Sequence, residues 1–354
     1  MSSDISAFEY LRQKARKTGS LLSIHLDITY RCPLKCIHCY IDHRENRELS
    51  ITEITKVLKD ARRLNAVFIT YSGGEVFVRE DFEDILKISY KLNYVIKIIT
   101  SGYLISDYEV EMLKRYNVTS VGVSLYAVDP EIHDRITGVR GSFNRTIRAI
   151  ELLKNAKINV VVKTSIMRPN YKDYLNLLRW IKSQGRRVSA QYDMVITPTK
   201  CNRSGVRDLN IPYKKKRSLL SEIKRIEAKR ETKIEDMDDY NQQYRVSEDS
   251  ITCYAGITGI YIAPNGKVFP CVEWDELLGD LRKESLIEIW KNSERLMQIR
   301  NLRIKDYKKC VSCKYLSACS ICPGLNLRDK KDIFEPSDLA CQRARMYYEQ
   351  EKTS

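Results

Sequence analysis

The chain has 354 residues, of which 43% are hydrophobic, so it is long enough for one large α/β domain plus a smaller one and too apolar to be disordered overall. Its formal net charge of +15 comes from basic runs that we interpret as solvated helix faces, with a docking surface for an acidic partner as the alternative. The sequence contains no membrane-spanning apolar run, no secretion signal and no nucleic-acid-binding motif, so we expect a cytoplasmic protein without a membrane or nucleic-acid partner.

Residues 21–200 alternate between short β-branched segments and amphipathic helical segments. Strands are predicted at 22–29, 67–71, 95–100, 120–125, 159–165 and 188–195, and helices at 51–64, 81–91, 106–116, 142–155 and 171–184. Ser50 and Glu53 have the spacing of a capping box at the start of the first of these helices. Repeated strand–helix units with short apolar strands predict an α/β fold, a partial (β/α)6 TIM-like barrel of parallel strands.

The remaining segments flank this predicted barrel. Residues 1–20 are interpreted as an N-terminal extension, and residues 201–250 as a linker that contains a charged bridging helix at about 212–230. Residues 251–354 form a small cysteine-rich C-terminal domain in this prediction. Within it, Asn265-Gly266 predicts a tight hairpin turn between two apolar strands.

Eleven cysteines in a chain expected to lie in a reducing compartment favour metal binding over disulfides. Cys32, Cys36 and Cys39 follow the first predicted strand, where a loop can turn three thiolates toward one point. Three thiolates leave one iron of a 4Fe–4S cube open for a ligand. A Cys3His zinc site with His38 is the alternative, although this cysteine spacing is unusual for zinc.

The CxxxCxxC spacing of these cysteines resembles the radical S-adenosylmethionine (SAM) superfamily. In that family a 4Fe–4S cluster binds SAM, and an electron cleaves SAM to a 5′-deoxyadenosyl radical that abstracts a hydrogen atom. Gly73, Gly74 and Glu75 follow the second strand and resemble the family's GGE motif, which implies that they bind the SAM amino group. Relatives commonly have Pro next, whereas this chain has Val76.

Two serines at the ends of later strands extend the resemblance. Ser101 lies where relatives carry the Asn of Thr-Asn-Gly, which implies a further SAM contact. Ser124 lies where the family often has a hydroxyl near the SAM ribose or carboxylate, with a plain strand-end serine as the alternative. Thr137 stands where many relatives carry Arg, so the resemblance does not imply a carboxylate-binding Arg in this chain.

The C-terminal cysteines resemble the SPASM domain, an auxiliary-cluster domain of peptide and protein maturases. The resemblance implies one or two auxiliary iron–sulfur clusters. By position, Cys253, Cys271 and Cys322 would hold the first, with one position open, and the second would be held by Cys310, Cys313, Cys319 and Cys341. Structural zinc sites are the alternative, because they need about the same cysteines.

Cys201 is left over after this assignment. An inert thiol is one interpretation; the other is a hydrogen-atom donor, a ligand of the open auxiliary cluster or a thiol that contacts substrate. Because it follows the sixth strand, we keep it as a candidate catalytic residue.

Segments 124–143 and 192–198 resemble the peptide-maturing branch of the superfamily. The resemblance implies hydrogen abstraction from a ribosomal precursor peptide, giving a thioether, a carbon–carbon crosslink or an epimer. It also implies an electron donor such as flavodoxin or ferredoxin, and a small leader-binding protein is a further expected partner. The alternatives are a maturase of a cofactor such as a haem or quinone and, outside the enzymes, a zinc-binding scaffold protein.

Overall fold

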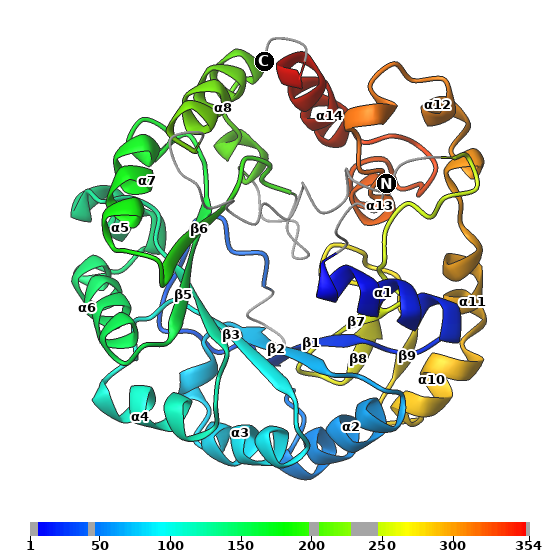
Figure 1. Ribbon diagram of the computed structural model, residues 1–354, viewed down its shortest axis with the longest axis horizontal. Coiled ribbons are helices and arrows are strands. Elements are labelled where there is room, and N and C mark those ends of the chain that lie inside the picture. Colours follow the sequence, from blue (N-terminus) through cyan, green and yellow to red (C-terminus); the bar gives the residue numbers. More distant parts are fainter. Residues whose placement is uncertain (1–5, 42–46, 198–204, 228–246, 352–354) are drawn as a thin grey trace.

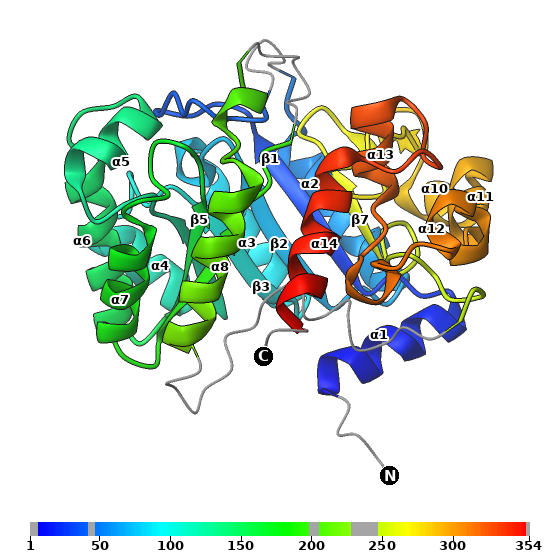
Figure 2. The same ribbon diagram turned by 90° about the horizontal axis from the view of Figure 1, so that it is seen from above.

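The computed structural model describes residues 6–41, 47–197, 205–227 and 247–351 (Figure 1). Its centre is one nine-stranded sheet in the order β6-β5-β4-β3-β2-β1-β7-β8-β9. The first six strands are β1 Ser23–Thr29, β2 Phe68–Gly73, β3 Val95–Thr100, β4 Ser120–Ser124, β5 Asn159–Ser165 and β6 Val188–Asp193. Each is parallel to its neighbour, and together they curve into the predicted partial barrel (Figures 1 and 2).

Helices cover the outer face of these six strands (Figure 1). They are α2 Ile51–Arg63, α3 Phe82–Lys91, α4 Asp107–Arg115, α5 Pro130–Thr137, α6 Ser142–Asn155 and α7 Tyr174–Ser183, and α8 Tyr213–Glu227 follows β6. The capping box predicted for α2 is present: the Ser50 amide donates to Glu53 Oε2 at 2.7 Å, and the Glu53 amide donates to Ser50 Oγ at 3.3 Å.

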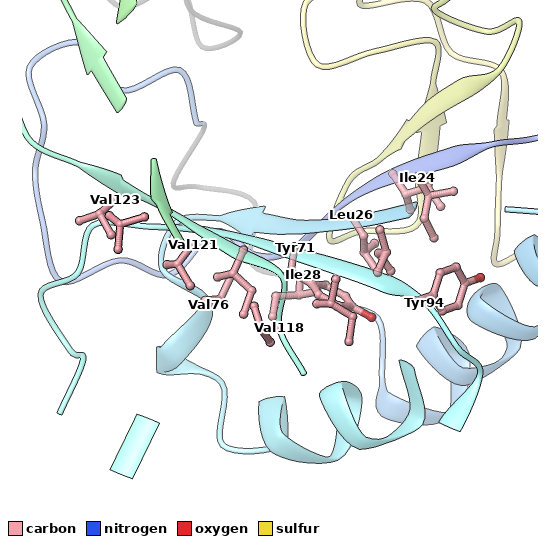
Figure 3. Packing of buried hydrophobic residues seen from close by; sticks show 14 of the residues in the cluster. Ile24, Leu26, Ile28, Tyr71, Val76, Tyr94, Val118, Val121 and Val123 are labelled. Carbon is pink, nitrogen blue, oxygen red and sulfur yellow. The ribbon is translucent and has the colours of Figure 1, made fainter. Parts of the chain in front are cut away.

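The side chains of β1 alternate between the hydrophobic core, under the helices, and the inner face of the barrel. Ile24, Leu26 and Ile28 are at most 1% exposed and point toward the helical layer (Figure 3). Burying one such side chain contributes about 1.5–3 kcal/mol. Since successive side chains of a strand point to opposite faces, His25 and Asp27 point to the inner, concave face.

The C-terminal region extends the same sheet. The predicted hairpin is present as β7 Gly259–Ile262 and β8 Lys267–Phe269, and β9 Gly279–Asp280 follows. Strand β7 pairs in parallel with β1, so the cysteine-rich region shares the sheet of the barrel. The helices of this region are α10 Leu286–Asn292, α11 Glu294–Asn301, α12 Lys308–Val311, α13 Pro323–Lys330 and α14 Asp338–Glu351.

The N-terminal extension contains a helix, α1 Ala7–Thr18, that begins at the N-cap Ser6 and ends at the left-handed Gly19. It is tied to the C-terminal region, because Tyr254 donates to Glu9 at 2.9 Å and the Trp290 indole donates to the Gly19 carbonyl at 2.9 Å. Among the residues described, no helix is both long enough and apolar enough to cross a lipid bilayer.

Candidate active site and cluster sites

The loop after β1 carries the first three cysteines and rests on the end of α5. The amides of Lys35 and Ile37 donate to the carbonyls of Thr137 and Ile136 at 2.8 and 3.0 Å. Within the loop, the Cys39 amide donates to the Cys36 carbonyl at 3.1 Å. These bonds fix the backbone from which the three thiols project.

The three thiols lie close enough to influence one another. Burial, followed by the charges of Cys39 and Cys32, raises the pKa of Cys36 to about 12. Burial likewise raises the pKa of Cys32 to about 12, with smaller contributions from Glu75 and Cys39. Buried, mutually repelling thiols ionise when a cation joins them, so this donor set fits an iron–sulfur cluster.

The glycine pair at the end of β2 lies against this cysteine loop. The amide of Gly74 donates to the Thr29 carbonyl at 2.8 Å, and that of Glu75 donates to the Arg31 carbonyl at 3.0 Å. A Cβ at Gly73, whose φ is +130°, would lie 2.1 Å from the Thr29 oxygen, and one at Gly74 would lie 2.3 Å from the Arg31 oxygen. Only glycine therefore permits this close approach of the two segments.

Glu75 is the buried acid of the site, with 1% exposure. Its carboxylate accepts hydrogen bonds from Thr100 Oγ1 at 2.7 Å, from the Ser101 amide at 2.9 Å and from the Ser101 hydroxyl. Burial raises the pKa of Glu75, and these hydrogen bonds oppose the shift. A buried carboxylate held by neutral donors fits a ligand that brings an ammonium group.

Ser124 lies at the carboxyl end of β4, close to the buried hydroxyl of Tyr126, and that hydroxyl lies close to the Cys36 thiol. The structure thus gathers Gly73, Gly74, Glu75 and Ser101 around the cysteine loop and connects Ser124 to it through Tyr126. Tyr126 and Thr100 were missed by the sequence analysis. Their position at or just after a barrel strand is the signal that could have found them.

The C-terminal thiols influence one another in two groups, and their assignment to two clusters stays a prediction. Cys253 and Cys271 lie beside Cys322: burial, followed by the charge of Cys322, raises the pKa of Cys253 to about 12 and that of Cys271 well above its ordinary value. The second group consists of Cys310, Cys313, Cys319 and Cys341. Within it, burial, followed by the charges of the neighbouring thiols, raises the pKa of Cys319 to about 12.

The second group lines a pocket together with Cys322 of the first group, apolar residues of α14 and the segment before α13. Within the described ranges, no three His, Cys, Asp or Glu side chains meet at the short distances of a site for a single metal ion. Cys201 lies outside the described residues, so its candidate role stays a prediction.

Comparison with known proteins adds two family matches. The family model of the Radical SAM superfamily matches residues 26–181, and that of an iron–sulfur cluster-binding domain, SPASM, matches residues 253–320.

Three individual proteins illustrate what the chain is similar to. It is 24% identical over 317 residues to an AdoMet-dependent haem synthase of Methanosarcina barkeri, covering 84% of this chain and 89% of the relative. It is 26% identical over 317 residues to the antilisterial bacteriocin subtilosin biosynthesis protein AlbA of Bacillus subtilis, covering 85% and 67%. The crystal structure of Streptococcus suis SuiB bound to precursor peptide SuiA superposes with a TM-score of 0.73 at 20% identity, covering 96% and 82%, which shows the shared fold.

Proposed function

We propose that this chain, which belongs to the radical SAM superfamily and carries a SPASM domain, abstracts a hydrogen atom from a ribosomally made precursor peptide. As a radical SAM enzyme it uses SAM and a 4Fe–4S cluster, and its SPASM domain binds auxiliary iron–sulfur clusters. The observation that supports a peptide substrate is the match, over 85% of this chain, to AlbA, a bacteriocin biosynthesis protein.

In this proposal the cysteine loop holds the SAM-binding cluster through Cys32, Cys36 and Cys39. Together, the cluster and SAM supply the radical that abstracts hydrogen. Glu75, oriented by Thr100 and Ser101, would accept hydrogen bonds from the SAM ammonium. Gly73 and Gly74 would keep that carboxylate beside the cluster loop. A Cβ at Gly73 would collide with the Thr29 carbonyl, and a Cβ at Gly74 would collide with the Arg31 carbonyl.

The SPASM groups would hold one or two auxiliary clusters, with Cys253, Cys271 and Cys322 on the first and the remaining four cysteines on the second. Such a cluster could accept the electron that an oxidative modification releases. The products proposed for the peptide are a thioether, a carbon–carbon crosslink or an epimer. A flavodoxin or ferredoxin would supply the reductant, and a small protein would bind the leader segment.

A cofactor precursor is the second candidate substrate. It is favoured by the match to a haem synthase, which covers 89% of that relative's length. A porphyrin or quinone precursor would replace the peptide, while the SAM and cluster sites would stay the same.

The test uses holoenzyme reconstituted without oxygen, together with SAM, dithionite and candidate precursor peptides, taken from short reading frames that neighbour the gene. We expect the peptide to lose two mass units for a thioether or crosslink, or, for an epimer, to keep its mass in H2O and to gain about one mass unit in D2O, because one hydrogen is replaced by deuterium. Formation of 5′-deoxyadenosine without any change in the peptide, together with turnover of a porphyrin precursor of haem, would favour the second candidate.

A further inference from the structure

The concave face of β1 carries a hydrogen-bonded pair that the proposed SAM and cluster sites do not use. His25 Nε2 lies 3.2 Å from Asp27 Oδ1, and we call these two residues the His25–Asp27 dyad. The Asp27 side chain is fully buried, whereas 29% of the His25 side chain remains exposed. The arrangement thus has a buried carboxylate behind a partly exposed imidazole.

Two tyrosine hydroxyls hold the other oxygen of the carboxylate. Tyr261 donates to Asp27 Oδ2 at 2.8 Å, and Tyr40 donates to the same oxygen at 3.3 Å. The Tyr261 hydroxyl also lies 3.1 Å from that of Tyr30. Burial, followed by the charge of Asp27, raises the pKa of Tyr261 well above its ordinary value, so Tyr261 remains a neutral donor.

Tyr261 reaches this position because β7 joins the barrel sheet. It is the register partner of His25, and the two rings meet edge to face with centroids 5.6 Å apart. The ring therefore fixes the imidazole while its hydroxyl fixes the carboxylate. The SPASM half of the chain thus completes a site on the inner face of the radical SAM half.

The chemistry of such a pair is that of a general base. Asp27 accepts from one imidazole nitrogen, which sets the tautomer, and its charge stabilises the imidazolium that forms when the other nitrogen takes a proton. The alternative is that Asp27 only joins β1 to β7. That role requires its hydrogen bond from Tyr261, but it does not require the second hydrogen bond, to a partly exposed histidine.

We propose that His25 is the proton acceptor of the reaction and that Asp27 and Tyr261 position it; this rests on the proposed peptide modification. Joining a C–H carbon to a second atom that carries S–H or C–H removes two hydrogens. One leaves as a hydrogen atom to the 5′-deoxyadenosyl radical, giving 5′-deoxyadenosine. The other leaves as a proton to His25, and the remaining electron passes to an iron–sulfur cluster of the SPASM domain, so the new bond forms with atoms and electrons balanced.

The test compares wild-type holoenzyme with His25→Gln, Asp27→Asn and Tyr261→Phe, using SAM, dithionite and the precursor peptide that the wild-type enzyme modifies, in D2O. Thr70→Val is the matched control, because Thr70 is the register partner of His25 on β2 and also lies on the inner face. The measurements are iron per chain, 5′-deoxyadenosine, modified peptide and deuterium in the unmodified peptide.

We expect His25→Gln to keep its iron and to form 5′-deoxyadenosine within about twofold of wild type, while the ratio of modified peptide to 5′-deoxyadenosine falls about 100-fold, the low end for loss of a general base. The recovered peptide should carry deuterium, because the substrate radical is quenched instead of oxidised. Asp27→Asn and Tyr261→Phe should lower the same ratio less, and Thr70→Val should not change it.

A merely structural role would lower iron and 5′-deoxyadenosine together in these variants and leave the ratio unchanged, which would overturn the inference. An epimer as the wild-type product would also overturn it, because that reaction releases no proton and electron. A wild-type enzyme that leaves the peptide unmodified would instead contradict the proposed function itself.

A second measurement does not need turnover. Diethyl pyrocarbonate modifies accessible imidazoles, and the chain has only four histidines to map by mass spectrometry. We expect His25 of the holoenzyme to be labelled and the precursor peptide to slow that labelling at least about fivefold. A His25 that resists the reagent, or is labelled equally with and without peptide, would show that substrate does not reach it.

Discussion

At the residue scale, Glu75 gives the sharpest test of the proposed SAM site. We expect Glu75→Gln to weaken SAM binding about ten- to a hundredfold, because a charge-assisted hydrogen bond contributes about 1.5–3 kcal/mol. The same change should raise the melting temperature of SAM-free holoenzyme at neutral pH, since a neutral amide avoids the desolvation that raises the pKa of the buried carboxyl. Calorimetric titration with SAM and thermal unfolding measure the two effects.

The pH dependence of the folding stability follows from the direction in which burial shifts the pKa of Glu75. A carboxyl group whose folded pKa is raised contributes stability below its ordinary pKa of 4.5, and the contribution is lost as the pH rises through the raised value. Glu75→Gln should remove this part of the pH profile. Glu151→Gln, at an exposed position of α6, is the matched control and should change neither SAM affinity nor the profile. Wild-type affinity in Glu75→Gln would contradict the assignment.

At the element scale, Arg79 holds together the two ends of the segment that contains the cluster loop. Its Nη1 donates to the carbonyls of Ile28, at the end of β1, and Leu49, just before α2, at 2.8 and 3.0 Å. Its Nε and Nη2 donate to the Asp81 carboxylate at 2.8 and 2.7 Å. The side chain is only 5% exposed, so these bonds are protected from water.

We expect Arg79→Met to lower the free energy of unfolding by about 3 kcal/mol, because two hydrogen bonds from a charged donor to backbone carbonyls are lost. Iron bound per chain should fall as well, since the ends of the cluster segment separate. Urea unfolding and iron analysis test this. Arg115→Met is the control: its ion pair with Glu83 is exposed, so its removal should change stability by less than about 1 kcal/mol. Equal effects of the two changes would refute this role of Arg79.

The elements of the barrel were predictable because their signals are local. Short β-branched segments, a capping box at Ser50 and helical periodicity predicted β1–β6 and helices α2, α3, α4, α6 and α7 within a few residues. The short helix α5, between β4 and β5, was missed. Parallel strands also place their carboxyl ends at one edge, so the gathering of Glu75 and Ser101 near the cysteine loop followed from the order of motifs.

At the scale of the whole molecule, the sequence analysis missed what depends on contacts between distant segments. The pairing of β1 with β7 joins residues more than 230 positions apart, and no local pattern encodes which free edge a hairpin will join. The contacts of Tyr126, Arg79 and His25 were missed for the same reason, because each involves a neighbour supplied by another element. Helix α1 was missed although its N-cap Ser6 and the left-handed Gly19 are local signals.

The proposed division of the C-terminal cysteines between two clusters also belongs to the scale of the whole molecule, and it makes a quantitative prediction. Cys319 and Cys322 are three residues apart, but Cys319 lies near Cys310 and Cys341, whereas Cys322 lies near Cys253 and Cys271. With three 4Fe–4S clusters the holoenzyme should bind about twelve irons. Cys319→Ala and Cys322→Ala should each lose up to about four.

The double variant separates this division from the alternative of one shared cluster. If the two thiols serve different clusters, the losses of iron add, and the double variant should keep about four irons, those of the SAM-binding cluster. If both serve the same cluster, the double variant should lose no more iron than either single one. Ser312→Ala, at an exposed position between two cysteines, controls for disturbance of the loops and should keep all about twelve. Because SAM cleavage needs only the first cluster, the double variant should still form 5′-deoxyadenosine, which distinguishes loss of auxiliary clusters from loss of the fold.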